Sequence, residues 1–393
     1  MIIITDKKEC CGCTACEQIC PVHCISMNED NEGFKYAKAD AEKCINCGAC
    51  DKVCPIKNHK KQVTFEKQAY LVQNKDAQIL EESTSGGAFT AIAEYVIDKG
   101  GIVYGVEMTD DYIVRHIAVD NKEDLAKFRN SKYVQSDLGN SFSEVKEQLK
   151  SGRWVCFSGT PCQVEGLIQY LGRPYDNLIL VDVVCRAVPS PGVWKKYIAA
   201  EIARRGKAIS IRFRDKALGY QYSTMEITAI DGKTERGGIE SQPWLRMFFS
   251  GMIIRPSCSE CKFRSPYRKS DFTIWDCFPT YKYDKNWNED AGTTRILIHT
   301  EKGKDLFQKI RNNFMVMELP VDEAISGVKE MALSPKENEC KASFFNELEQ
   351  RGIDAAIQKY FHETSKVRIK KDIRLFLNQH GLDKAVKHVL KKG

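Results

Sequence analysis

Eight cysteines near the start of the chain follow one spacing twice, and this repeat limits the fold more than any other feature. The first run is Cys10, Cys13, Cys16 and Cys20, followed by Pro21, and the second is Cys44, Cys47, Cys50 and Cys54, followed by Pro55. The pattern is typical of paired 4Fe-4S clusters, in which the fourth cysteine of each run ligates the other cluster. We therefore predict one cluster on Cys10, Cys13, Cys16 and Cys54, and a second on Cys44, Cys47, Cys50 and Cys20.

Two plainer interpretations of this stretch fit it less well. A disulfide framework needs an oxidising compartment. Zinc sites pair two CxxC units across a longer gap and lack the third step and the final Cys-Pro. Gly12 and Gly48 recur between the predicted ligands, where the backbone must turn tightly around an inorganic core. Cys11 and Cys24 lie outside the pattern, and we expect both to be small buried fillers.

Composition favours a globular protein of the reducing cytoplasm. The chain has 393 residues, 42% of them hydrophobic, which allows two or three domains. Its 17 cysteines are not preceded by an export signal, and no apolar run approaches the roughly 18 residues that a bilayer span needs. The net charge of +6 is concentrated from Lys366 onward, where nine Lys and Arg face two Asp. The rest of the chain therefore gives no general nucleic-acid footprint.

Strand and helix patterns alternate in the middle of the chain, which predicts an α/β domain with a parallel sheet. We expect strands at 154–157 and 178–184, followed by helices at 163–171 and 191–205. Cys162 and Cys185 follow these strands, so both are expected at the carboxyl edge of the sheet, where ligands of open α/β sheets collect. The stretch 56–68 is rich in lysine and glutamine and is interpreted as a linker.

Two polar segments have the composition of ligand-binding loops. Residues 83–87, Ser-Thr-Ser-Gly-Gly, precede a helix expected at 88–99 and offer N-cap oxygens and close backbone approach to an anion or a flat ring. Residues 129–136 combine an arginine, a lysine, hydroxyls and an aromatic ring, which suits a phosphate or isoalloxazine contact; an exposed turn is the plainer interpretation.

The second half of the chain carries weaker signals. A hairpin turn is expected at Asp231-Gly232. A lone CxxC stands at Cys258 and Cys261, and such a pair is ambiguous between a metal site and a redox dithiol. From residue 346 the pattern is helical and increasingly basic, with Ile369, Ile373, Phe376 and Leu377 on one side, so we expect a surface helix docked on its own domain.

The order of these motifs resembles the beta subunits of coenzyme F420 hydrogenases and dehydrogenases, a family that includes hydroxymethyl-chlorophyll reductase and bacterial relatives linked to polysaccharide loci. The resemblance covers about residues 1 to 315, through the segments 83–87, 131–133, 159–163, 213–216 and 258–261. It implies an α/β domain that binds FAD and a third 4Fe-4S cluster close to the flavin. The third-cluster ligands that it implies are Cys162, Cys185, Cys258 and Cys261.

Flavin phosphates need hydrogen-bond donors and a cation, for which the candidates are Ser85, Gly86, Gly87, Thr160 and Lys132. The other expected cofactor contacts are Ser131, Tyr133, Gly159 and Pro161. Arg214 and Lys216 are expected on a flavin edge or an anionic substrate, with a solvent-facing strand end as the alternative. FMN would use the same contacts as FAD.

Two segments depart from the family pattern and both are expected to border the substrate side of the flavin. Residues 185–187 read Cys-Arg-Ala where many relatives have Cys-His-Gly, and residues 275–278 read Trp-Asp-Cys-Phe where they carry Gly-Asp before an aromatic residue and glycine. Cys277 therefore competes as fourth ligand of the third cluster. The candidates for catalytic proton transfer are Lys216, Tyr133 and Asp276, with Tyr220 as a further proton donor.

The sequence thus predicts a cytoplasmic iron-sulfur flavoprotein with three units: a two-cluster ferredoxin domain at 1–60, an α/β catalytic domain at 61–340 and a basic helical extension at 341–393. In the leading hypothesis, a ferredoxin or another redox protein supplies electrons through the clusters to the flavin, which reduces a small organic substrate by hydride transfer. The alternative is an electron-transfer subunit that oxidises or reduces the deazaflavin coenzyme F420 for a partner enzyme. A non-enzymatic redox sensor with the basic tail as a nucleic-acid arm ranks below both, and a homo-oligomer is compatible with all three.

Overall fold

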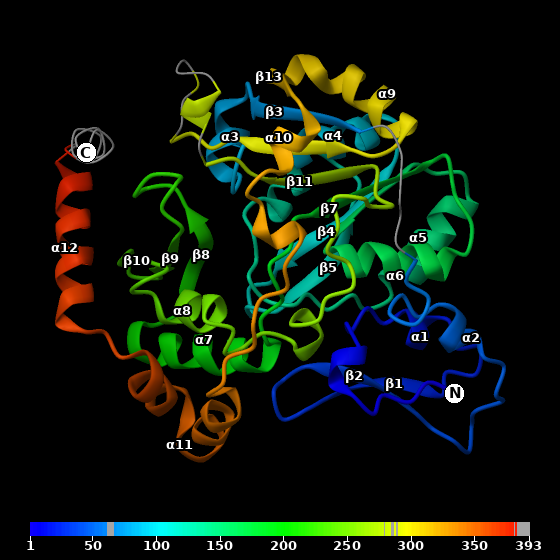
Figure 1. Ribbon diagram of the computed structural model, residues 1–393, viewed down its shortest axis with the longest axis horizontal. Helices are drawn as coiled ribbons and strands as arrows, with labels where there is room; N and C mark the ends of the chain where they lie inside the picture. Colours follow the sequence, from blue (N-terminus) through cyan, green and yellow to red (C-terminus); the bar gives the residue numbers. More distant parts are fainter. Residues whose placement is uncertain (61–66, 279, 284–286, 288–289, 381, 383–393) are drawn as a thin grey trace.

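An eight-stranded sheet forms the centre of the molecule (Figure 1). The structure, a computed structural model, describes residues 1–60, 67–278, 280–283, 287, 290–380 and 382. The strand order is β13-β3-β12-β11-β7-β6-β4-β5. The parallel strands are β4 (Ile102–Met108), β6 (Val155–Gly159), β7 (Leu178–Val183) and β11 (Phe272–Asp276). The antiparallel ones are β3 (Gln68–Asn74), β5 (Val114–Val119), β12 (Thr294–Ile298) and β13 (Phe314–Leu319). The predicted α/β class is confirmed, and the predicted parallel strands form the centre of a mixed sheet.

Helices cover both faces of this sheet. Val155 and Phe157 of β6 pack with α5 (Ser141–Lys150) and α6 (Pro161–Leu171) on one face. Cys156 faces the opposite way, into the core formed with α4 (Ala88–Asp98) and α9 (Glu301–Ile310). Side chains alternate across a strand, so strands covered on both faces must be apolar throughout. This explains why the residues of β6 and β7 read as continuous apolar runs.

A second sheet and the helices α7, α8 and α11 form a lobe beside the main sheet. The antiparallel sheet has the order β10 (Thr234–Gly238), β9 (Thr224–Ala229) and β8 (Ala208–Asp215), and the predicted hairpin turn at Asp231-Gly232 connects β9 to β10. Its core contains Trp194 of α7 (Pro191–Arg205) and Trp244 of α8 (Pro243–Phe249), whose rings lie 4.9 Å apart. Helix α11 (Lys341–Phe361) packs on this core.

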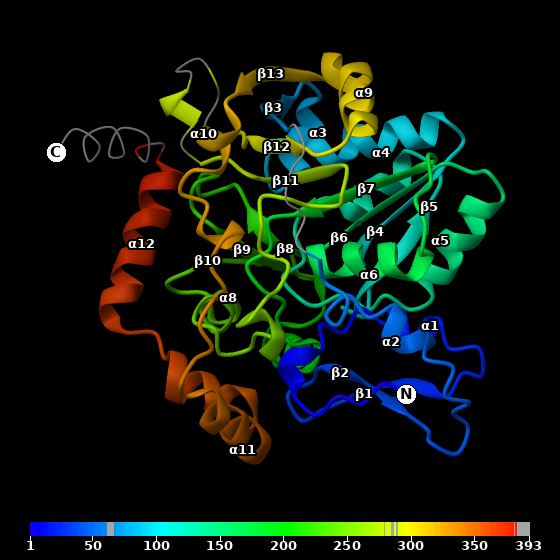
Figure 2. The ribbon, with the colours of Figure 1, turned by 45° about the vertical axis from the view of Figure 1, so that its right-hand side comes forward.

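The N-terminal domain packs against α6 (Figures 1 and 2). It consists of the short helices α1 (Ala15–Gln18) and α2 (Ala49–Lys52) and the hairpin of β1 (Ile25–Glu29) and β2 (Lys35–Ala39). Cys13 belongs to the same apolar core as α5 and α6. A Cβ atom on Gly166 of α6 would lie 2.9 Å from the Cβ of Cys13, so the glycine allows this close approach. Residues 61–66 of the expected linker lie outside the described residues.

The C-terminal helix α12 (Ser365–Gln379) forms as expected but its apolar side is not docked. Ile369, Ile373 and Phe376 are 57%, 54% and 53% exposed, so the expectation of a docked surface helix is wrong for these side chains. Figure 2 shows α12 at the edge of the molecule, beyond α11. The end of the basic tail, 383–393, lies outside the described residues. None of the described helices has the length and apolar character that crossing a bilayer requires.

The remaining short helices of the α/β domain are α3 (Ala77–Glu82), which precedes the glycine-containing loop, and α10 (Val321–Ile325). One-turn 3-10 helices include those at Lys7–Glu9 and Pro256–Cys258.

Candidate functional site

Four cysteines gather where the N-terminal domain meets α6. Burial, with the charges of Cys10 and Cys54, raises the pKa of the Cys16 thiol to about 12. A hydrogen bond with Cys11 lowers the pKa of Cys13, but burial and the charges of Cys16 and Cys10 outweigh it. Four thiolates this close repel one another, and iron ions supply the positive charge that lets them lose their protons. The structure thus brings together the set predicted for the first cluster.

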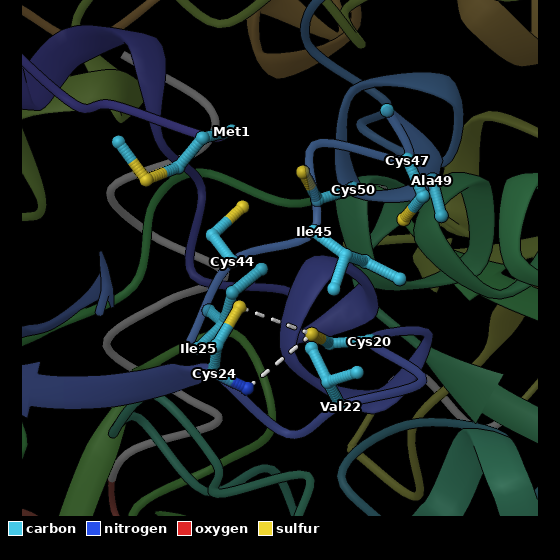
Figure 3. Close-up of a pocket in the computed structure, with 11 residues that line it drawn as sticks. Met1, Cys20, Val22, Cys24, Ile25, Cys44, Ile45, Cys47, Ala49 and Cys50 are labelled. Atoms are coloured by element: carbon cyan, nitrogen blue, oxygen red, sulfur yellow. Dashed lines mark hydrogen bonds between the residues drawn. The ribbon is translucent and has the colours of Figure 1, made fainter. Parts of the chain in front are cut away.

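Five cysteines line a second cavity in the same domain. Figure 3 shows this cavity with Cys20, Cys44, Cys47 and Cys50, the set predicted for the second cluster, and with Cys24 beside Cys20. The sulfur atoms of Cys20 and Cys24 are 3.4 Å apart, so Cys24 is placed as a fifth thiol of the cavity and not only as a filler. Cys47 is exposed, and the neighbouring Ile45 is 60% exposed, so this cavity lies close to the surface.

Left-handed residues shape the turns of both cysteine runs. Gly12 and Gly48 have φ values of +71° and +70°, as a tight turn around a cluster requires. In the first run the second left-handed residue is Thr14, at +61°, and in the second run it is Asn46, at +52°. Each run therefore uses two left-handed residues, and only one of each pair is a glycine that sequence reasoning could recognise.

A third set of cysteines meets between α6, the end of β7 and the CxxC segment. Burial raises the pKa of Cys185 well above its usual value, and the charges of Cys258, Cys162 and Cys261 add to this rise. Cys162 lies in the first turn of α6, and Cys258 ends the 3-10 helix Pro256–Cys258. Four soft thiol donors suit an iron-sulfur cluster, and the described residues hold no group of three or more His, Cys, Asp or Glu side chains placed to hold a single metal ion such as zinc.

Cys277 is not part of this third set. It packs in a separate core with Leu71 and Leu297. Burial raises the pKa of its thiol, and the positive charge of Arg295 opposes this rise. The expectation that Cys277 competes as the fourth ligand is therefore wrong.

Cys11 connects the first and third sets. Its thiol is close enough to Cys13 of the first set and to Cys162 of the third for both groups to act on its pKa. It is 6% exposed and packs in the core shared by the N-terminal domain and α6. The two sets are therefore separated by little more than this one side chain.

A pocket of about 370 Å³ opens at the carboxyl ends of β6, β7 and β11, within the size range of cofactor sites. Seven of the residues predicted to contact a cofactor line it: Ser85, Gly87, Ser131, Lys132, Tyr133, Gly159 and Thr160. Asp276 also lines it. Cys185 is part of the same wall, so the third cysteine set borders the pocket.

Four of the predicted cofactor residues stand behind the pocket wall: Gly86, Pro161, Arg214 and Lys216. Gly86 donates its backbone N–H to the Oγ1 of Thr294 at 2.8 Å. Arg214 donates to the Tyr133 hydroxyl at 3.1 Å and to Asp276 Oδ2 at 2.9 Å. Lys216 donates to three backbone carbonyls, including that of Ser85 at 3.1 Å.

Arg214 and Lys216 are 6% and 7% exposed, so neither the predicted ligand contact nor a solvent-facing strand end describes them. They support the pocket walls from behind. Tyr220 has a similar place, since its hydroxyl donates to Asp276 Oδ1 at 3.0 Å, and burial raises its pKa well above the usual value.

Lys132 brings an uncompensated cation to the pocket. Its Nζ donates to the backbone carbonyls of Lys127 and Arg129 at 2.7 and 2.8 Å. Burial lowers its pKa to about 7. The ion pairs found among the described residues do not include Lys132, so an anionic ligand would meet a cation that is not already neutralised.

Sequence comparisons match both halves of one family and a cluster-binding domain. The family is described as "Coenzyme F420 hydrogenase/dehydrogenase, beta subunit"; residues 69–142 match its N-terminal part, and residues 152–323 match its C-terminal part. The chain belongs to the coenzyme F420 hydrogenase/dehydrogenase beta-subunit family. Residues 9–58 match a 4Fe-4S dicluster domain. The beta-subunit family is one of oxidoreductases, and the resemblance inferred from the sequence motifs is confirmed.

A curated relative of this family member is the F420-dependent formate dehydrogenase 1 subunit beta of Methanococcus maripaludis, 26% identical over 250 residues. The match covers 61% of this chain and 58% of that protein. Among solved structures, the F420-reducing [NiFe] hydrogenase complex from Methanosarcina barkeri contains a chain that aligns over 74% of this one and 90% of its own length, with 14% identity and a TM-score of 0.44.

Three further residues line the pocket of this family member: Arg129 from the segment 129–136 that was expected to contact a cofactor, and Arg186 and Trp275, which were expected only on the substrate side. The Nε atoms of Arg129 and Arg186 and the Nε1 of Trp275 are buried and have no hydrogen-bond partner within the described part of the chain. Buried donors are normally paired. These three nitrogens are covered by protein atoms, and Arg129 and Arg186 form ion pairs with Glu82 and Glu330 through their terminal nitrogens. The signal for Arg186 and Trp275 was present in the sequence, since both lie in the segments that depart from the family pattern.

Proposed function

We propose that this chain is the electron-transfer subunit of an oxidoreductase and that it exchanges electrons between a deazaflavin coenzyme of the F420 type and a redox partner protein. The observation that carries the proposal is the series of three cysteine sets that ends at the wall of a cationic pocket. The family match and the F420-dependent relative support this alternative over the reduction of an unrelated small substrate.

The three sets are ordered by their contacts. Cys47 of the second set is exposed, which suits exchange with a partner protein. Cys50 of that set is close enough to Cys16 of the first set for its charge to act on the Cys16 thiol. Cys11 joins the first set to Cys162, and Cys185 reaches the pocket. Clusters bound to these sets would supply one-electron transfer.

The pocket is built to bind an anionic ring compound. Arg129, Lys132 and Arg186 line it with a single carboxylate, Asp276. Arg129 pairs with Glu82, Arg186 with Glu330 and Arg214 with Asp276, so Lys132 is the lining cation whose charge is left for a ligand. Because Arg214 donates to the Tyr133 hydroxyl, the hydroxyl hydrogen is left to donate to a pocket ligand. A flavin in this pocket, with FAD as the expectation, would supply the conversion between hydride transfer and one-electron transfer.

The decisive experiment measures cofactors and coenzyme turnover on the same preparation. Anaerobically purified protein is expected to contain about twelve irons, from three four-iron clusters, and one FAD. It is expected to reduce F420 with an artificial electron donor, or to oxidise the reduced coenzyme with an artificial acceptor. Cys258→Ala is expected to remove about four irons and to leave the N-terminal clusters in place. Eight irons, no flavin and no reaction with F420 would reject the proposal.

One observation favours a second candidate, in which the flavin reduces a small organic substrate. Arg186 and Trp275 replace family residues and both line the pocket, so its ligand can differ from that of the relatives. The two candidates are separated by asking which compound reoxidises the reduced isolated chain. Reoxidation by F420 supports the first candidate, and reoxidation only by an organic acceptor supports the second.

A further inference from the structure

Arg255 is a buried cation between the first and third cysteine sets. Its residue is 1% exposed, which places it among the largest fully buried side chains. It immediately precedes the 3-10 helix Pro256–Cys258, and its carbonyl accepts the backbone N–H of Cys258 at 2.9 Å. The backbone of Arg255 therefore belongs to the segment that carries a ligand of the third set.

The side chain of Arg255 reaches into the N-terminal domain. Its Nε donates to the carbonyl of Cys10 at 2.7 Å, and its Nη2 lies 3.6 Å from the Cys10 sulfur and 2.9 Å from the carbonyl of Lys35. Its Nη1 donates to Gln135 Oε1 at 3.0 Å, and the guanidinium lies 4.3 Å from the centre of the Tyr36 ring. One side chain thus contacts a ligand of the first set, its backbone and the strand β2.

Cysteine thiols supply the negative charge near this cation. None of the ion pairs found in the described part of the chain pairs Arg255 with a carboxylate. The groups whose negative charge raises the pKa of Arg255 are Cys10, Tyr36, Cys11 and Cys258. A buried charge is costly unless it is paired. A 4Fe-4S cluster held by four thiolates is anionic, so clusters on the two flanking sets would provide the missing counter-charge.

We propose that Arg255 is a positioning residue that acts as a shared counter-charge for the first and third clusters and raises the reduction potential of the first. The inference rests on the proposed cluster assignment. Reduction adds one electron to a cluster and makes it more negative, so a buried cation beside Cys10 stabilises the reduced form more than the oxidised form. It also links cluster binding to domain docking, because the same guanidinium fastens the N-terminal domain to the segment of Cys258.

The test is a potentiometric titration of the full-length, cluster-loaded protein followed by electron paramagnetic resonance. Arg255→Met is expected to lower the potential of the first cluster by about 59 mV or more, which is a tenfold shift in its reduced-to-oxidised ratio for a one-electron couple. Arg255→Lys keeps the charge and is expected to shift it less. Arg264→Met is the matched control: Arg264 acts on Cys185 and Cys261 of the third set, so the first cluster should keep its potential.

Gln135→Glu is a second test variant, used if Arg255→Met does not fold and bind its iron-sulfur clusters. This variant keeps the arginine and places a carboxylate at the 3.0 Å contact, which neutralises the cation locally. It is also expected to lower the potential of the first cluster. An unchanged potential in iron-loaded Gln135→Glu, or in Arg255→Met where that variant assembles, would overturn the proposal. Iron content and F420 turnover of the wild type test the proposed function separately, because the first-cluster potential is measured without F420.

Discussion

At the residue scale, Cys24 is placed to replace a predicted ligand. Its sulfur lies 3.4 Å from that of Cys20 (Figure 3). Two thiolates on one tetrahedral metal ion with bonds of about 2.3 Å lie about 3.8 Å apart, so Cys24 and Cys20 can reach the same iron. We expect Cys20→Ala to keep its second cluster and the double variant with Cys24→Ala to lose about four irons, as measured by iron and sulfide analysis.

Cys47→Ala provides the control for this prediction, because the short sulfur contact is at Cys20 and not at Cys47. The control is expected to lose the second cluster by itself. Equal iron loss in Cys20→Ala and in the double variant would show that Cys24 does not act as a ligand.

Lys132 should make the pocket sensitive to pH. Burial lowers its pKa from the usual 10.5 to about 7, so it loses its charge as the pH rises through this value. An anionic ligand binds the charged form, so affinity for F420 or FAD is expected to weaken as the pH rises from 6 to 9. A hydrogen bond to a charged group contributes about 1.5 kcal/mol, which corresponds to about tenfold in affinity.

Fluorescence titrations at several pH values would measure this effect. Lys132→Met should bind more weakly at pH 6 and should lack the decline that belongs to the lysine. Lys122→Met is the control, because Lys122 is exposed and paired with Asp98. The same pH profile in wild type and Lys132→Met would contradict the assignment of Lys132 as an anion contact.

At the scale of elements, β12 holds the glycine-containing loop in place. The Oγ1 of Thr294 accepts the backbone N–H of Gly86 at 2.8 Å and is 2.7 Å from the hydroxyl of Ser85. Thr294→Val has nearly the same shape but leaves the buried N–H unpaired, so we expect the free energy of unfolding to fall by about 1–3 kcal/mol. Denaturant titration of the variant, with Thr294→Ser as the control that keeps the oxygen, would measure this change.

Short sequence patterns were sufficient to predict the secondary-structure elements that depend only on residues close together in the chain. The two strand–helix units and the Asp231-Gly232 turn were predicted and are present. The surroundings of Arg214, in β8, and of Lys216, directly after β8, were predicted wrongly. This strand belongs to a second sheet, and residue statistics for a strand end say nothing of what packs on it. The apolar stripe of α12 was expected to be buried, yet a periodic pattern does not specify a partner surface.

At the scale of the whole molecule, the N-terminal domain is fixed to the rest by contacts that are distant in sequence. Lys341 of α11 pairs with Glu32 at 2.8 Å, and Gly192 of α7 donates its backbone N–H to the carbonyl of Gly33 at 3.3 Å. The sequence suggested two clusters on a linker. It held no sign of this docking, because each contact joins residues more than 150 positions apart. The approach of Cys258 to Cys162 was likewise available only through the family resemblance.

The backbone contact between Gly33 and Gly192 can be tested directly. A Cβ atom on Gly192 would lie 2.6 Å from the Cα of Gly33, and backbone atoms at both positions leave little room to adjust. Gly192→Ala is therefore expected to loosen the docking of the N-terminal domain while the iron content stays at about twelve. Limited proteolysis should then cleave faster between residues 56 and 68, and small-angle scattering should show a larger radius of gyration.

Loosened docking would also separate the first cysteine set from Cys162, so reduction of the third cluster by a donor protein should slow while its reduction by a small chemical reductant does not. Gly172→Ala is the control, because its φ of +71° makes alanine unfavourable through the backbone alone, and no heavy atom lies within 4 Å of the added Cβ. It measures the effect of a general loss of stability of about 1 kcal/mol. If both variants are cleaved and reduced at the same rates, the Gly33–Gly192 contact does not control electron transfer between the domains.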